Sequence, residues 1–170
     1  FIFYKLFKRF LLGNSQVVIW SLLIGGVFLI VFELLHREKT DAVDNVASIS
    51  YSQAIFIGLF QSIAIIPGVS RSAATIIGGL LLGLKRKTIV EFSFLLAVPT
   101  MLVATVLDLS KNVNTFTHNQ FILLLLGFIT SFIVALLAIK FLLAFIQKHS
   151  FIAFGVYRIL IALLFLFIVH

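Results

Sequence analysis

The chain has 170 residues, of which 62% are hydrophobic and only 11% are charged. Soluble domains carry about 25% charged residues, so this composition excludes an ordinary soluble protein, and its hydrophobicity excludes a disordered one. The net charge of +7 comes from Lys and Arg that mostly flank apolar runs, which is typical of membrane proteins rather than of nucleic-acid binders. The sequence contains no cysteine, which excludes disulfides and thiolate metal sites.

Apolar runs predict an all-α, polytopic membrane helix bundle that forms a single domain over residues 1–170. A spanning helix needs about 20 mainly apolar residues. Residues 1–12 mix basic and aromatic residues, and they predict either an interfacial amphipathic helix or the end of a spanning helix. Four spanning helices are expected near residues 16–35, 89–107, 120–146 and 151–169, and a polar loop over 36–50.

The block 51–84 is apolar, but Pro67 and Gly68 interrupt it near its middle. One continuous helix of this length would measure about 50 Å at 1.5 Å per residue, well beyond a ~30 Å hydrocarbon core. Two half-helices, 51–66 and 72–84, meeting at a Pro-Gly break favour a re-entrant pair, one half of an inverted-repeat architecture. A single spanning helix kinked at Pro67 is the alternative.

Small and polar residues recur at helical spacing, and such stripes let membrane helices approach closely. Packing alone accounts for most of them, whereas Ser72 and Thr75 lie beside a buried charge. The three stripes are Ala54, Gly58, Gln61 and Ser62; Ser72, Thr75, Gly79 and Gly83; and Ser93, Ala97, Thr100, Ala104 and Asp108.

Loop charges predict an orientation in the membrane. If the loops around residues 39, 86 and 148 share one side, the positive-inside rule makes that side cytoplasmic and the C-terminus external. The block 51–84 must then enter and leave on the cytoplasmic side. The basic residues concerned are Arg37, Lys39, Lys85, Arg86, Lys87 and Lys148.

Arg71 is the one ionisable side chain of block 51–84 apart from Tyr51. A charge at bilayer depth costs roughly 2.5–3.5 kcal/mol on insertion scales, so such a residue indicates a functional site. Ser70 or Ser72 can cap the outgoing helix, whose free N–H groups favour an anion. The Arg71 guanidinium adds a planar fork that suits two phosphate oxygens.

The predicted ligand is therefore a phosphate or diphosphate held inside a membrane protein. In the alternative, Arg71 pairs with Glu91 or Asp108 and only braces the bundle. Glu91 could also stabilise a helix N-terminus or help to bind a metal. The four histidines lie in polar loops or at a terminus without ligand spacing, and no Ser-His-Asp arrangement, P-loop or zinc spacing is present.

The segments PGVSRSAATI (67–76) and EFSFLLAVPTMLVATVLDL (91–109) together resemble the bacterial undecaprenyl-diphosphate phosphatase family, also called bacitracin-resistance proteins. The family signature reads Pro-Gly-x-Ser-Arg-Ser with Thr three residues later. The chain departs from it at Ala73, where the family usually has Gly. This departure concerns only how closely the backbone can approach a ligand.

The resemblance implies a phosphatase that converts undecaprenyl diphosphate to the monophosphate carrier used in peptidoglycan synthesis, and thereby confers bacitracin resistance. It implies catalytic roles for Ser70, Arg71 and Ser72, and substrate-binding roles for Gly68, Thr75 and Gln61, with no metal ligand in this chain. The implied cofactor is a divalent cation, Mg²⁺ or Ca²⁺. The implied partners are a polyprenyl diphosphate, membrane lipids and a second copy of the chain, without nucleic acid. The implied location is the bacterial plasma membrane, with the site open to the outer face.

The family also has an N-terminal signature of two Glu four residues apart followed by Ser and His, and it is not found in this chain. We therefore expect the C-terminal portion of the enzyme, which holds the phosphate-binding half-site and does not turn over alone. The proposed nucleophile and most cation ligands would lie in the preceding half. A lipid-phosphate transporter using the same anion site, and a structural subunit with a buried ion pair, are the rival hypotheses.

Overall fold

The computed structural model describes residues 15–38, 41–112, 117–146 and 150–169. Within these ranges the chain is helical and contains no strand, apart from one isolated bridge between Val43 and Leu84. This confirms the all-α prediction, whereas the prediction for residues 1–12 lies outside the described ranges. The helices are α2 (Ser15–Leu35), α3 (Tyr51–Ser62), α4 (Arg71–Leu81), α5 (Arg86–Asn112), α6 (His118–Ile146) and α7 (Ile152–Val169), with short 3₁₀ turns η1 (Val46–Ser48) and η2 (Ile63–Ile65).

Three described helices, α2, α5 and α6, are long and apolar enough to cross a membrane. Most of their large apolar side chains are exposed, because the described chain does not cover them. A soluble protein rarely exposes so continuous an apolar surface. The helices are thus consistent with a multi-pass membrane protein.

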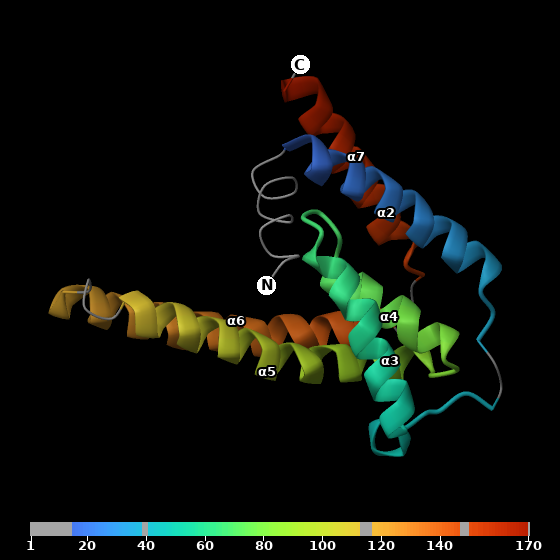
Figure 1. The fold of residues 1–170 in the computed structure, drawn as a ribbon, viewed down its shortest axis with the longest axis horizontal. Coiled ribbons are helices and arrows are strands. Elements are labelled where there is room, and N and C mark those ends of the chain that lie inside the picture. Colours follow the sequence, from blue (N-terminus) through green and yellow to red (C-terminus); the bar gives the residue numbers. More distant parts are fainter. Residues whose placement is uncertain (1–14, 39–40, 113–116, 147–149, 170) are drawn as a thin grey trace, which may run out of the picture.

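Helices α2 and α7 run side by side over most of their length (Figure 1). Glycines on both helices permit this contact. A Cβ added to Gly26 would lie 2.8 Å from the carbonyl oxygen of Gly155, so neither position leaves room for a side chain. Small residues at helix interfaces allow such close backbone approach in membranes.

Helices α3 and α4 form a hairpin that is broken at its tip. The helical path of α3 and η2 ends at Ile65, and α4 begins only at Arg71, so a single kinked helix is not formed. The side-chain amide of Gln53, at the start of α3, donates to the carbonyl oxygen of Leu82 at the end of α4 at 3.1 Å. The two open ends of the hairpin therefore lie together, opposite the tip.

Helix α5 packs against α4 with its first half, where Ile89, Val90 and Ser93 are buried. Its second half extends away from the other helices beside α6 (Figure 1), and every residue of the range 101–112 is exposed. The core consequently sits between α3, α4 and the first half of α5, directly below the broken tip.

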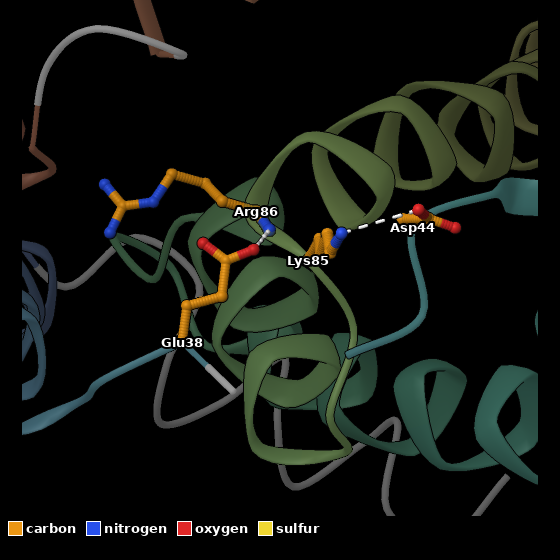
Figure 2. Close-up of polar contacts among 4 residues, drawn as sticks. All are labelled: Glu38, Asp44, Lys85 and Arg86. Carbon is orange, nitrogen blue, oxygen red and sulfur yellow. Dashed lines mark hydrogen bonds and ion pairs between the residues drawn. The ribbon is translucent and has the colours of Figure 1, made fainter. Parts of the chain in front are cut away.

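A polar network joins the loops at the open end of the α3–α4 hairpin. Lys85 Nζ lies 3.4 Å from Asp44 Oδ2, and the backbone N–H of Arg86 donates to Glu38 Oε1 at 3.2 Å (Figure 2). The Arg86 guanidinium also stacks 4.7 Å above the ring of Phe151. The described parts of the loops that follow α2 and α4 thus meet at the open end of the hairpin, near Phe151.

Candidate anion site at the broken helix tip

The tip between η2 and α4 is shaped by two residues with restricted or special backbone conformations. Pro67 cannot continue the hydrogen bonding of η2, and Gly68 adopts φ +91°, which L side chains rarely adopt. A Cβ at Gly68 would lie 2.7 Å from the carbonyl oxygen of Val18 on α2. The tip therefore needs glycine for its conformation and for its close contact with α2.

Of the two predicted candidates, Ser70 and Ser72, it is Ser70 that caps the N-terminus of α4. Its Oγ accepts from the backbone N–H of Ala73 at 3.2 Å. The next N–H group, of Ala74, donates to the Ser70 carbonyl oxygen. The amides of Arg71 and Ser72, at the very start of α4, have no intrahelical acceptor and remain available to an anion.

The hydroxyls of Ser70 and Ser72 lie together at this helix end, 3.1 Å apart. Ser70 is half-buried and Ser72 is exposed. Both line a cavity of about 440 Å³. Two of the three predicted catalytic residues thus face one cavity.

Arg71 is half-buried, and its Nη1 donates to the Thr100 hydroxyl on α5 at 3.0 Å. No ion pair links it to a carboxylate anywhere in the described part of the chain, so the bracing alternative with Glu91 or Asp108 is not formed. Asp108 instead accepts from Asn112 on its own helix. The remaining N–H groups of the Arg71 guanidinium are consequently not engaged by a negative charge.

The cavity beside the tip is mainly apolar with a polar wall. Apolar side chains from α2, α4, α5, α6 and α7 form most of it, and a smaller cavity of about 190 Å³ shares Ser70 and Arg158. Such a cavity suits an amphiphile, with its polar group at the wall and its apolar part inside. The polar residues of the wall are Ser70, Ser72, Ser93, Tyr157 and Arg158.

The three predicted substrate-binding residues lie around the tip but not in the cavity lining. Thr75 is fully buried, and its hydroxyl lies 2.6 Å from that of Ser93 and within reach of two carbonyl oxygens of α4, so it links α4 to α5. Gln61 is half-buried near the end of α3. The Gly68 carbonyl oxygen is occupied by Arg158. Their roles towards a substrate stay predictions.

Arg158 is the polar residue of this region that the sequence reasoning missed. It comes from the middle of the apolar helix α7, and its Nη2 donates to the carbonyl oxygens of Gly68 at 2.9 Å and Ser21 at 3.2 Å. It thereby ties the tip to α2 and α7 at once. The signal was present, because a charge within an apolar helix indicates a functional or structural site, as for Arg71.

The tip residues do not fit a divalent cation. Mg²⁺ and Ca²⁺ bind oxygen ligands that usually include at least one carboxylate, whereas this site offers guanidinium, hydroxyl and N–H groups. Among the residues that the structure describes, no three His, Asp or Glu side chains lie close enough to hold a metal ion. The expected role of Mg²⁺ or Ca²⁺ stays a prediction.

A profile of the bacitracin resistance protein BacA family matches residues 1–164 of the chain. The chain belongs to the bacitracin resistance protein family. A protein of Aquifex aeolicus named undecaprenyl-diphosphatase is 52% identical over 97% of this chain and 64% of its own length. Proteins of the same name from Sulfurihydrogenibium sp. and Campylobacter jejuni are each 50% identical, over 97% and 94% of this chain and 65% and 60% of their own lengths.

The chain thus spans just under two thirds of the length of these relatives. The matched part includes the broken tip, α4 and all of α5. Family membership therefore covers the part of the chain that forms the broken tip, while the anion site there stays a prediction.

Proposed function

We propose that the chain provides the diphosphate-binding part of an undecaprenyl-diphosphate phosphatase, which recycles the lipid carrier of peptidoglycan synthesis and confers bacitracin resistance. The observation that carries this proposal is Arg71, which begins α4 between two serines, donates to Thr100 on α5 and has no carboxylate bound to it within the described chain. A guanidinium in this setting favours a phosphate ligand, and related proteins are named for that substrate.

Transfer of a phosphoryl group to water needs positioning and stabilisation of charge on the transferred group. Arg71 and the first amides of α4 supply positive charge and N–H donors at a fixed place. Ser70 and Ser72 offer hydroxyls to the same group. A divalent cation, if bound with the remaining ligands outside the tip, would supply further neutralisation of the diphosphate.

The depth of the site suits a lipid substrate. Helix α4 has 11 residues and is about 16 Å long at 1.5 Å per residue, so a hairpin that enters along the bilayer normal would carry its tip about halfway through a ~30 Å hydrocarbon core. We propose that the open end, with its basic loops, faces the cytoplasm and that the tip is reached from the outer face of the plasma membrane. The apolar cavity and the bilayer would then receive the polyprenyl chain.

The decisive experiment places this chain in the frame of a relative. A chimera replaces the matched part of the Aquifex aeolicus protein by residues 1–164, and phosphate release from undecaprenyl diphosphate is measured in detergent with Mg²⁺. We expect turnover by the chimera and its loss in Arg71→Ala. Turnover that survives Arg71→Ala would refute the proposed site.

The same preparation separates the phosphatase from a transporter. A transporter would move polyprenyl phosphate across vesicles without releasing inorganic phosphate. Lipid movement without phosphate release would therefore replace the phosphatase proposal by the transporter. The structural-subunit hypothesis predicts instead that Arg71→Ala fails to fold, which the thermal midpoint of the purified variant measures.

A further inference from the structure

Within the described structure, Thr100 on α5 is the one side chain to which the Arg71 guanidinium donates a hydrogen bond, at 3.0 Å. Its own Oγ1 lies 3.1 Å from the carbonyl oxygen of Leu96 and 3.0 Å from that of Ala97. A hydroxyl has one proton and two lone pairs. Because the proton goes to one of these carbonyls, a lone pair of Thr100 is aimed at Arg71.

This contact determines how the guanidinium is presented. A free arginine side chain samples many rotamers, and the entropy lost when these are restricted opposes binding. Holding Nη1 against Thr100 leaves the edge formed by Nε and Nη2 free, and that edge can form two parallel hydrogen bonds to a phosphate. Thr100 therefore pre-organises the bidentate edge of Arg71.

A second hydroxyl link keeps the two helices in register. Thr75 lies one turn after Arg71 on α4, and its hydroxyl meets Ser93 on α5 at 2.6 Å in a buried contact. Ser93 lies two turns before Thr100 on α5. The two links thus lie along one α4–α5 contact. The buried Thr75–Ser93 link fixes the distance between the two helices that the Arg71–Thr100 link needs.

Thr100 has little packing of its own to contribute. It is half-buried, and every residue of α5 from 101 to 112 is exposed. The preceding Pro99 is also exposed and lacks an N–H for the helix. Among the hydrogen bonds of the described residues, the one with Arg71 joins Thr100 to another helix, whereas its other two stay within α5.

We propose that Thr100 is the positioning residue for Arg71, which holds the guanidinium so that its free edge receives a diphosphate. This inference rests on the proposed function, because it takes the ligand of Arg71 to be an anion. It adds a residue from α5 to a site otherwise built from the tip and α4.

The test uses the chimera with the Aquifex aeolicus protein in lipid nanodiscs and measures its binding of inorganic pyrophosphate by isothermal titration calorimetry. The chimera without a further substitution is called the original chain. Thr100→Val keeps the shape but cannot accept a hydrogen bond, and Thr100→Ser keeps the hydroxyl. The matched control is Thr130→Val, because Thr130 donates to the Leu126 carbonyl oxygen on the exposed helix α6 and lies outside the cavity lining. Arg71→Ala is the positive control for loss of binding.

We expect Thr100→Val to weaken pyrophosphate binding about five- to tenfold, the factor that one hydrogen bond of ordinary strength accounts for. Thr100→Ser should stay within about twofold of the original chain, as should Thr130→Val, and all three thermal midpoints should change little. If Thr100 only stabilised the fold, Thr100→Val would lower the thermal midpoint, and Thr100→Ser would not restore pyrophosphate binding.

Two results would overturn the inference in distinguishable ways. If the original chain binds pyrophosphate and Arg71→Ala does not, equal affinity of Thr100→Val and the original chain refutes the positioning role but leaves the proposed function. If the original chain binds no pyrophosphate, the anion site itself fails and the positioning role fails with it.

Discussion

The Arg71 side chain should contribute most of the binding energy for the transferred phosphate. With Nη1 held by Thr100, two N–H groups of its other edge can bond a phosphate. Hydrogen bonds to charged groups contribute about 1.5–3 kcal/mol each, so Arg71→Ala should lose about 3–6 kcal/mol, or roughly 10²–10⁴-fold in kcat/KM. Arg71→Lys keeps the charge but loses the fork, and should lose roughly 10–100-fold.

The assay is phosphate release from undecaprenyl diphosphate by the chimera with the Aquifex aeolicus protein. Arg37→Ala is the matched control. Arg37 is exposed in a loop, so this substitution removes the same charge at a place away from the tip. Since Arg71 makes one hydrogen bond within the described protein, its loss should change the free energy of unfolding by about 1 kcal/mol. A kcat/KM for Arg71→Lys close to that of the unchanged chimera would refute bidentate phosphate binding.

Two further substitutions test the construction of the tip. Gly68→Ala should lower the free energy of unfolding by about 2–5 kcal/mol, measured by thermal unfolding in detergent, because it combines a positive φ with a clash against the Val18 carbonyl oxygen. Gly58→Ala is the control and should not lower it, because its methyl group meets nothing within 4 Å and alanine suits the interior of a helix better than glycine. Arg158→Met should lower it by about 1–3 kcal/mol, because the carbonyls of Gly68 and Ser21 lose their donor. An unchanged midpoint for Arg158→Met would show that these two hydrogen bonds do not hold the tip.

Local backbone chemistry made much of the tip predictable from the sequence. Pro67 cannot continue a helix, Gly68 permits a positive φ, and a serine before a helical run is a preferred N-cap. Each rule depends on residues a few positions apart. The structure accordingly shows the break and the cap at Ser70, while the catalytic roles of the tip residues stay predictions.

Contacts between helices could not be predicted in this way. Thr100 belonged to a stripe of small residues that packing alone explained, and its contact with Arg71 joins residues 29 positions apart. The bond from Arg158 to Gly68 joins residues 90 positions apart. Both depend on which faces of which helices meet, and hydropathy patterns leave that choice open.

The charge balance at the tip leads to a last prediction. Arg71 and Arg158 both belong to this region, and no described carboxylate forms an ion pair with either, since their partners are a hydroxyl and two carbonyl oxygens. Dipoles stabilise a guanidinium without neutralising it, so the site keeps a net positive charge in a medium of low dielectric constant. An anion with more negative charge should therefore gain more binding free energy at this site.

Inorganic pyrophosphate carries more negative charge at neutral pH than phosphate, and the two should differ in affinity for the chimera. At an effective dielectric constant near 20, one added charge about 6 Å from a guanidinium gains up to about 3 kcal/mol before desolvation, so we expect pyrophosphate to bind at least about tenfold more tightly. Titration of both anions into nanodiscs measures this ratio, and raising the salt concentration should change it little, because partly buried charges are weakly screened. Equal affinities would mean that the positive charge at the tip is already compensated, and the site would then have no electrostatic reason to select a diphosphate.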